Sequence, residues 1–74
     1  MEKIYKNNLC NSCRNIHPRM NSGSPSDLSI GDMLDSPGYQ GAGYFMMNHM
    51  ILLALEQNGG CSSCIRLLKK ASQS

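Results

Sequence analysis

Residues 10–13 read Cys-Asn-Ser-Cys and residues 61–64 read Cys-Ser-Ser-Cys, and these two motifs contain every cysteine of the 74-residue chain. A two-residue spacer lets both thiolates of a motif face one point, so the two motifs together supply four soft ligands for a tetrahedral metal ion. We predict a structural Zn²⁺ site with the ligands Cys10, Cys13, Cys61 and Cys64. Two disulfides, a redox-active pair and an iron centre are the alternatives for the same residues.

The length of the chain indicates a single domain over residues 1–74 with a thin hydrophobic core. Domains of this size usually add a metal ion or disulfides to the core. The first residues contain no apolar segment of a secretory signal, which favours the cytoplasm, where reduced thiols bind metal. The most apolar run, residues 44–55, is 12 residues long, whereas a bilayer span needs about 20. We therefore expect no membrane segment.

Two helices are predicted in the C-terminal half. Residues 44–57 contain no Gly or Pro and are followed by Asn58-Gly59-Gly60, a typical C-terminal stop. Residues 61–71 form an amphipathic helix that begins at the second cysteine motif and has a basic outer face. The first helix is apolar almost all round, apart from a polar stripe at His49 and Glu56 flanked by Asn48 and Gln57. One of its faces is therefore expected to meet a partner or a second copy, through Phe45, Met46, Met47, Met50 and Leu53.

The N-terminal half has weaker patterns. Residues 4–9 are predicted to form a short strand that leads into a tight turn at residues 10–13. Residues 20–43 are rich in Ser, Gly, Pro and Asp and are predicted to be mainly loop, either packed on the domain or ordered only by a partner. One short helix is expected inside this loop, capped by Ser29 with Asp32 and ended by Ser36-Pro37. The glycine-rich residues 38–43 are interpreted as a flexible loop.

These elements define a small, mostly α-helical domain with minor β-structure, in which a structural metal ion joins the two cysteine motifs. A turn that supplies one cysteine pair, and a helix whose first turn supplies the other, resemble the treble-clef group of zinc fingers. The resemblance implies the ligand roles of the four cysteines and a binding module, because that group includes DNA-, RNA- and protein-binding members. Members usually place a β-hairpin between the two pairs and a glycine after the first pair, where this chain has Arg14.

Charge is distributed unevenly along the chain. Residues 1–19 and residues 61–74 each carry a net charge of +3, and residues 20–60 carry −4. A metal ion that joins the two cysteine motifs would gather the basic ends into one cluster of Lys3, Lys6, Arg14, Arg19, Arg66, Lys69 and Lys70. Such a cluster suits attraction to a phosphate backbone. We therefore predict a regulator of nucleic acid or its machinery, in transcription, that binds nucleic acid or a nucleic-acid-bound complex.

The alternative is a protein-interaction module, an inhibitor or adaptor of the economical size that viruses and mobile elements encode, which docks or dimerises through residues 44–57. An enzyme with a small-molecule substrate is not expected, because four cysteine ligands leave no open position on zinc. His17 and His49 are interpreted as surface residues, since four thiolates already complete the ligand set.

Overall fold

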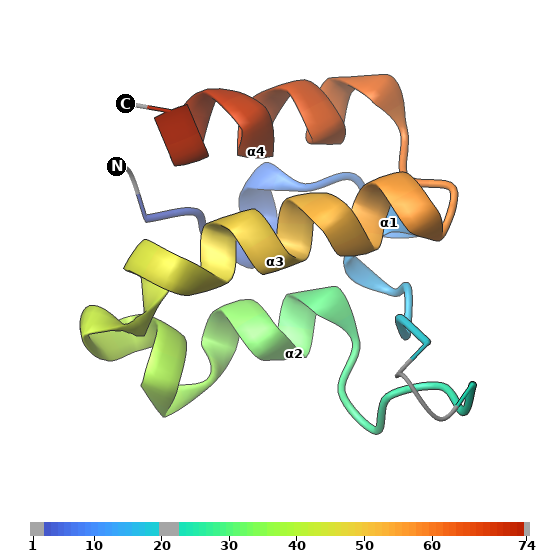
Figure 1. The fold of residues 1–74 in the computed structure, drawn as a ribbon, viewed down its shortest axis with the longest axis horizontal. Helices are drawn as coiled ribbons and strands as arrows, with labels where there is room; N and C mark the ends of the chain where they lie inside the picture. Colours follow the sequence, from blue (N-terminus) through green and yellow to red (C-terminus); the bar gives the residue numbers. More distant parts are fainter. Residues whose placement is uncertain (1–2, 20–22, 74) are drawn as a thin grey trace.

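The computed structural model describes residues 3–19 and 23–73, without the side chains of residues 42, 43 and 45 (Figure 1). The elements are η1 (Lys6–Asn8), α1 (Asn11–Arg14), α2 (Ile30–Asp35), η2 (Tyr39–Gly43), α3 (Tyr44–Gln57) and α4 (Ser62–Gln73). The described ranges contain no β-strand, only an isolated bridge between Arg19 and Pro25. The prediction of a small, mostly helical domain is confirmed, and its minor β-structure is absent from these ranges.

Helices α3 and α4 form an antiparallel pair along the long axis of the molecule (Figure 1). Leu55 of α3 and Leu68 of α4 are both fully buried, and removal of such side chains from water is the main stabilising term of the pair. The chain reverses direction after α3 because Gly59 adopts a positive φ of 77°. The amide of Gly60 then donates to the Leu55 carbonyl at 2.7 Å, which is the bond that ends a helix in a Schellman motif.

Helix α2 begins where its capping residues predict. The Ser29 hydroxyl accepts from the Asp32 amide at 3.2 Å, and the Asp32 carboxylate accepts from the Ser29 amide at 3.4 Å. This reciprocal capping satisfies two amides at the start of a helix. Ile30 and Leu34 then point into the core and are fully buried. The expected short helix inside residues 20–43 is confirmed, and residues 20–22 lie outside the described ranges.

The predicted strand over residues 4–9 is wrong. The segment instead makes the helical turn η1, in which the Asn8 side chain accepts from the Tyr5 amide at 2.9 Å. An asparagine side chain that bonds the nearby backbone competes with extended pairing. Ile4 and Leu9, on either side of the turn, are buried in the core. The segment therefore contributes apolar contacts without a sheet.

A buried hydrogen-bond chain corrects the predicted polar stripe of α3. Asn48 is fully buried, and its side-chain oxygen accepts from the Tyr39 hydroxyl at 2.6 Å. The same hydroxyl accepts from the Ile4 amide at 2.7 Å. Tyr39 belongs to η2, and residues 39–43 form a helical turn kinked at Gly41, in the segment where composition predicts a loop. These two hydrogen bonds connect the N-terminal segment, η2 and α3.

A search of the described residues for a helix long and apolar enough to cross a membrane finds none.

Candidate metal centre

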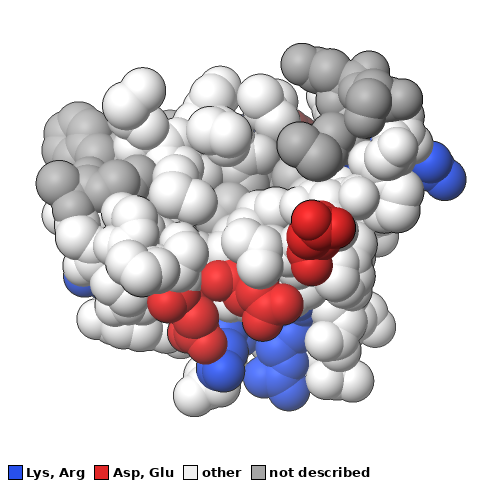
Figure 2. Space-filling view, turned by 90° about the horizontal axis from the view of Figure 1, so that it is seen from below, with Lys and Arg blue, Asp and Glu red and all other residues white. Residues whose placement is uncertain are grey.

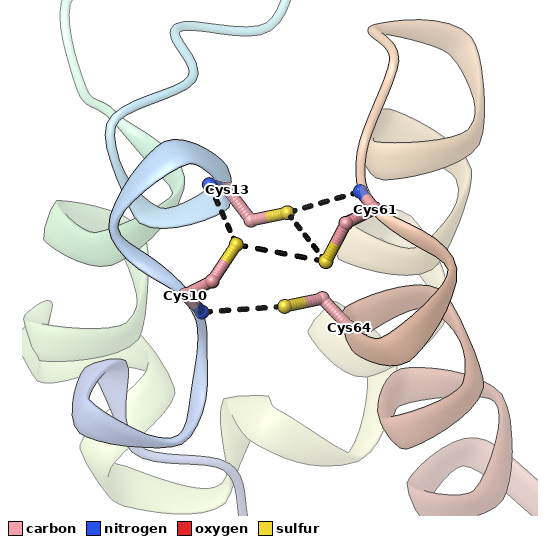
Figure 3. Close-up of side chains that lie close together, drawn as sticks. All are labelled: Cys10, Cys13, Cys61 and Cys64. Carbon is pink, nitrogen blue, oxygen red and sulfur yellow. Dashed lines mark hydrogen bonds between the residues drawn. The ribbon is translucent and has the colours of Figure 1, made fainter.

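The two cysteine motifs face each other, one from the α1 segment and one from the start of α4 (Figure 3). Cys10 is the N-cap of α1 and Cys13 lies inside that single helical turn, whereas Cys61 directly precedes α4 and Cys64 lies in the first turn of α4. The four sulfur atoms converge and all lie within 4.8 Å of one another. The structure therefore brings together all four predicted ligands.

The spacing of the sulfur atoms suits a tetrahedral thiolate site. The Cys10 and Cys61 sulfurs are 3.5 Å apart, and the Cys13 and Cys61 sulfurs are 3.6 Å apart. A zinc–sulfur bond length of about 2.3 Å implies sulfur–sulfur edges of about 3.8 Å in a tetrahedron. All four cysteines are free thiols. The residues present thus fit a metal ion, and zinc is the common occupant of a closed site with four cysteines.

Backbone amides support each sulfur in a cyclic pattern. The Cys13 amide donates to the Cys10 sulfur at 3.4 Å, and the Cys61 amide donates to the Cys13 sulfur at 3.2 Å. The Cys10 amide donates to the Cys64 sulfur at 3.3 Å, and the Cys64 amide in turn donates to the Cys61 sulfur. Donors aimed at sulfur favour the thiolate over the thiol. The short α1 turn and the start of α4 therefore supply both the ligands and the dipoles that stabilise their charge.

Burial divides the four thiols into two kinds. Cys13 and Cys64 are buried, which raises the pKa of Cys13 to about 12 and also raises the pKa of Cys64. Cys61 is exposed, and the hydrogen bond from the Cys64 amide, with help from neighbouring thiols, lowers its pKa to about 6. At neutral pH without metal, Cys61 is thus a thiolate while Cys13 and Cys64 carry protons. Metal must displace those protons.

Metal binding at pH 7 is therefore expected to release at least two protons, from Cys13 and Cys64. Since the bound form carries fewer protons, affinity should fall as the pH falls, by at least about two orders of magnitude per pH unit below 7. Isothermal titration of Zn²⁺ into the reduced protein, in buffers that differ in ionisation enthalpy, measures the number released. A proton count near zero would contradict the thiolate site.

The basic residues of the N-terminal half are partly engaged elsewhere. Lys6 pairs with Asp35 of α2 at 2.8 Å, so the acids of the middle segment are not segregated from the basic ends as the sequence indicates. Figure 2 shows basic side chains next to acidic ones on the side of the molecule that is seen from below. Lys3 donates to the Gln40 carbonyl at 2.8 Å and lies over the Tyr44 ring. Arg19 donates to the Gly23 carbonyl at 2.7 Å.

Helix α4 presents its basic residues differently. Arg66, Lys69 and Lys70 are all exposed, and they lie within one turn of the helix. Leu68 and Ala71 are buried on the opposite face and fix the rotation of the helix. Arg14, next to the ligand Cys13, is half-buried and donates to the Asn11 side chain at 3.2 Å. Of the seven predicted basic residues, Arg66, Lys69 and Lys70 thus form an exposed face on α4, whereas the other four make contacts within the protein.

The outer face of α3 exposes apolar side chains. Met46 is 76% exposed, Met50 64% and Leu53 42%, and Met47 is half-buried. The side chain of Phe45 lies outside the described part of the chain. Beside this face is a groove of about 440 Å³ that Met47, Met50 and Leu53 line together with residues from outside α3. The lining also includes Pro18 and Met33, which could not be predicted because neither lies in a sequence pattern that places it beside α3.

Both histidines are exposed, as predicted, and lie outside the cysteine cluster. The His17 ring donates from Nδ1 to the Ser26 carbonyl at 3.0 Å, which supports the connection between α1 and α2. The ligand set thus consists of thiols alone.

Comparison of the chain with protein-family models, curated proteins and solved structures finds no match. The β-hairpin that the treble-clef group usually places between the cysteine pairs is also absent from residues 14–19 and 23–60. What the chain shares with zinc fingers is a cluster of four cysteines at metal-binding distance.

Proposed function

We propose that the protein is a non-enzymatic zinc-binding domain that contacts the phosphate backbone of nucleic acid through the outer face of α4. The observation that carries the proposal is the exposure of Arg66, Lys69 and Lys70 on one helix that contains no acidic residue. Cations on a fixed face attract phosphate and release its counterions. A role as a regulator of transcription, on nucleic acid or on a complex bound to it, belongs to this proposal.

The metal centre supports this role by holding α4 in place. Cys64 ties the first turn of α4 to α1, and the buried Leu68 anchors the next turns against α3. With both contacts made, the basic residues face solvent without competing acids on the same helix. The arrangement of ligands, a turn and a helix start, resembles that of treble-clef zinc fingers. Four thiolates complete the coordination of zinc, so the site is structural and offers no position for a substrate.

The test is binding of a fluorescent 20-bp DNA duplex and a single-stranded RNA by the metal-loaded protein at several salt concentrations. Three phosphate contacts predict a slope of log K against log salt of about −2.7 for the duplex, or about 40-fold weaker binding at 200 mM than at 50 mM salt. Replacing Arg66, Lys69 and Lys70 by Gln should abolish this binding, because it removes the charges that contact phosphate.

The matched control replaces Lys3, Lys6 and Arg19 by Gln, which changes the net charge equally at residues already engaged within the protein. This variant should retain most of the affinity. Equal losses in the two variants would show an effect of net charge alone, and unchanged binding after the α4 substitutions would refute the proposed face.

The exposed face of α3 favours a second candidate, self-association. Met46, Met50 and Leu53 are spaced by four and three residues, which is the spacing of a helix–helix seam. A second copy in antiparallel orientation would bring Met46 close to Leu53 of the other copy, with Met50 near the two-fold axis. Met50→Gln separates the candidates, because it should weaken any dimer in analytical ultracentrifugation and leave nucleic-acid binding unchanged. A monomer at all concentrations would exclude this second candidate.

A further inference from the structure

The two exposed cysteines of the metal centre come from different motifs. Cys10 and Cys61 are exposed, whereas Cys13 and Cys64 are 1% and 4% exposed. The sulfur atoms of Cys10 and Cys61 are 3.5 Å apart, and Figure 3 shows them facing each other between α1 and the start of α4. A small oxidant in solution therefore reaches one sulfur of each motif.

We infer that Cys10 and Cys61 form an oxidation site at which a peroxide cross-links the two motifs and releases the metal ion. The inference goes beyond the proposed binding function and does not depend on it. The nucleophile is the sulfur of either exposed cysteine, and the oxidant is hydrogen peroxide or an alkyl hydroperoxide.

The chemistry balances in two steps. A thiolate attacks the peroxide, the O–O bond breaks, and the sulfur becomes a sulfenic acid while one oxygen leaves as water or an alcohol after protonation. The second thiolate then attacks the sulfenic sulfur, forms the S–S bond and displaces hydroxide, which is protonated to water. The two sulfurs together lose two electrons, and the peroxide gains them.

Geometry favours this pairing over the others. Whichever of Cys10 and Cys61 is oxidised first, the sulfur of the other lies 3.5 Å away and can attack it. Cys13 also lies 3.6 Å from Cys61, but its sulfur is buried and accepts the Cys61 amide at 3.2 Å. Among the four cysteines, only the Cys10–Cys61 bond joins two exposed residues, so oxidation can start from either of them.

Cross-linking would change what holds the two motifs together. Cys13 and Cys64 alone would offer half of the original ligands, which does not complete a structural zinc site. The new covalent bond would join α1 to the start of α4 at the position of the former coordination bonds. The oxidised protein should therefore retain its helices without metal.

Peptide mapping tests the inference on the metal-loaded, wild-type protein. After treatment with hydrogen peroxide, free thiols are alkylated in denaturant without reductant, and the protein is digested with trypsin. Cleavage after Lys6, Arg14, Arg19 and Arg66 leaves one cysteine motif in residues 7–14 and the other in residues 20–66. The expected product joins these two peptides, with alkyl groups on Cys13 and Cys64, and the intact protein loses two hydrogens.

A second measurement follows metal and helicity together. A chromogenic chelator should detect one released Zn²⁺ per cross-linked chain, and the circular dichroism of that chain should stay helical until a reductant is added. Separate peptides with internal disulfides, a cross-link through Cys13, or four unmodified thiols would overturn the inference. Loss of helicity in the cross-linked chain before reduction would overturn it as well.

Discussion

A strong chelator is expected to unfold the reduced protein, with loss of most of its helical circular dichroism. Coordination by four thiolates supplies on the order of 10 kcal/mol in small zinc domains. The hydrophobic core cannot replace this free energy of coordination. A chain of 74 residues buries a smaller fraction of its surface than a larger domain does, so the core alone stabilises the fold weakly. Native mass spectrometry before and after chelation should show one metal ion per chain and then none.

Substitution of a buried ligand should have the same effect as chelation. Cys13→Ser removes a thiolate that is 1% exposed, and we expect this variant to remain largely unfolded even with excess Zn²⁺. Ser12→Ala is the matched control, since Ser12 is exposed in the same turn of α1 and supplies no ligand. A Cys13→Ser protein as helical and as stable as the Ser12→Ala protein would refute the structural role of the metal.

Gly60→Ala is expected to destabilise the metal-loaded protein by about 3 kcal/mol, the upper part of the usual range for overpacking. A Cβ atom at Gly60 would lie 2.8 Å from two side-chain carbons of Leu55 and 3.0 Å from its carbonyl oxygen. Leu55 is fully buried and has no room to withdraw. Relief of the clash would shift Cys61, the next residue, away from the other ligands, so metal affinity should fall together with stability.

Alanine substitutions at two further glycines serve as controls for the loss of stability expected from Gly60→Ala. Gly38→Ala should be nearly neutral, because nothing lies within 4 Å of the added carbon. Gly59→Ala should cost about 1–2 kcal/mol, since it forces alanine into a positive φ but meets no atoms. Urea unfolding of the three metal-loaded variants gives the comparison. If Gly60→Ala proves no less stable than Gly38→Ala, the close packing at the end of α3 is not as described.

Several features could be predicted from the sequence because their causes are local. The spacing inside each cysteine motif identifies the ligands without knowledge of the fold. The cap at Ser29 and Asp32 and the stop at Gly59-Gly60 depend on residues a few positions apart, and the structure places helix boundaries there. The buried Leu68 and Ala71 in α4 likewise follow from the helical repeat of an amphipathic segment.

Other features depend on contacts between distant residues and could not be predicted. Asn48 is polar and flanks the predicted polar stripe of α3, yet it is fully buried, and its hydrogen bond with the Tyr39 hydroxyl makes that burial acceptable. Lys6 was counted in a free basic cluster, and only the packing of η1 on α2 brings Asp35 to it. The strand predicted at residues 4–9 failed because its sheet partner does not exist in the described chain.

The meeting of the two cysteine motifs makes a ring of the 47 residues between Cys13 and Cys61. The entropic cost of closing such a ring grows only with the logarithm of its length, by about 0.6 kcal/mol for each doubling. The free energy of metal coordination is far larger. Lengthening the connection between α1 and α2 would therefore add little to the cost of closing the ring, and this part of the chain can change in length while the ring stays closed.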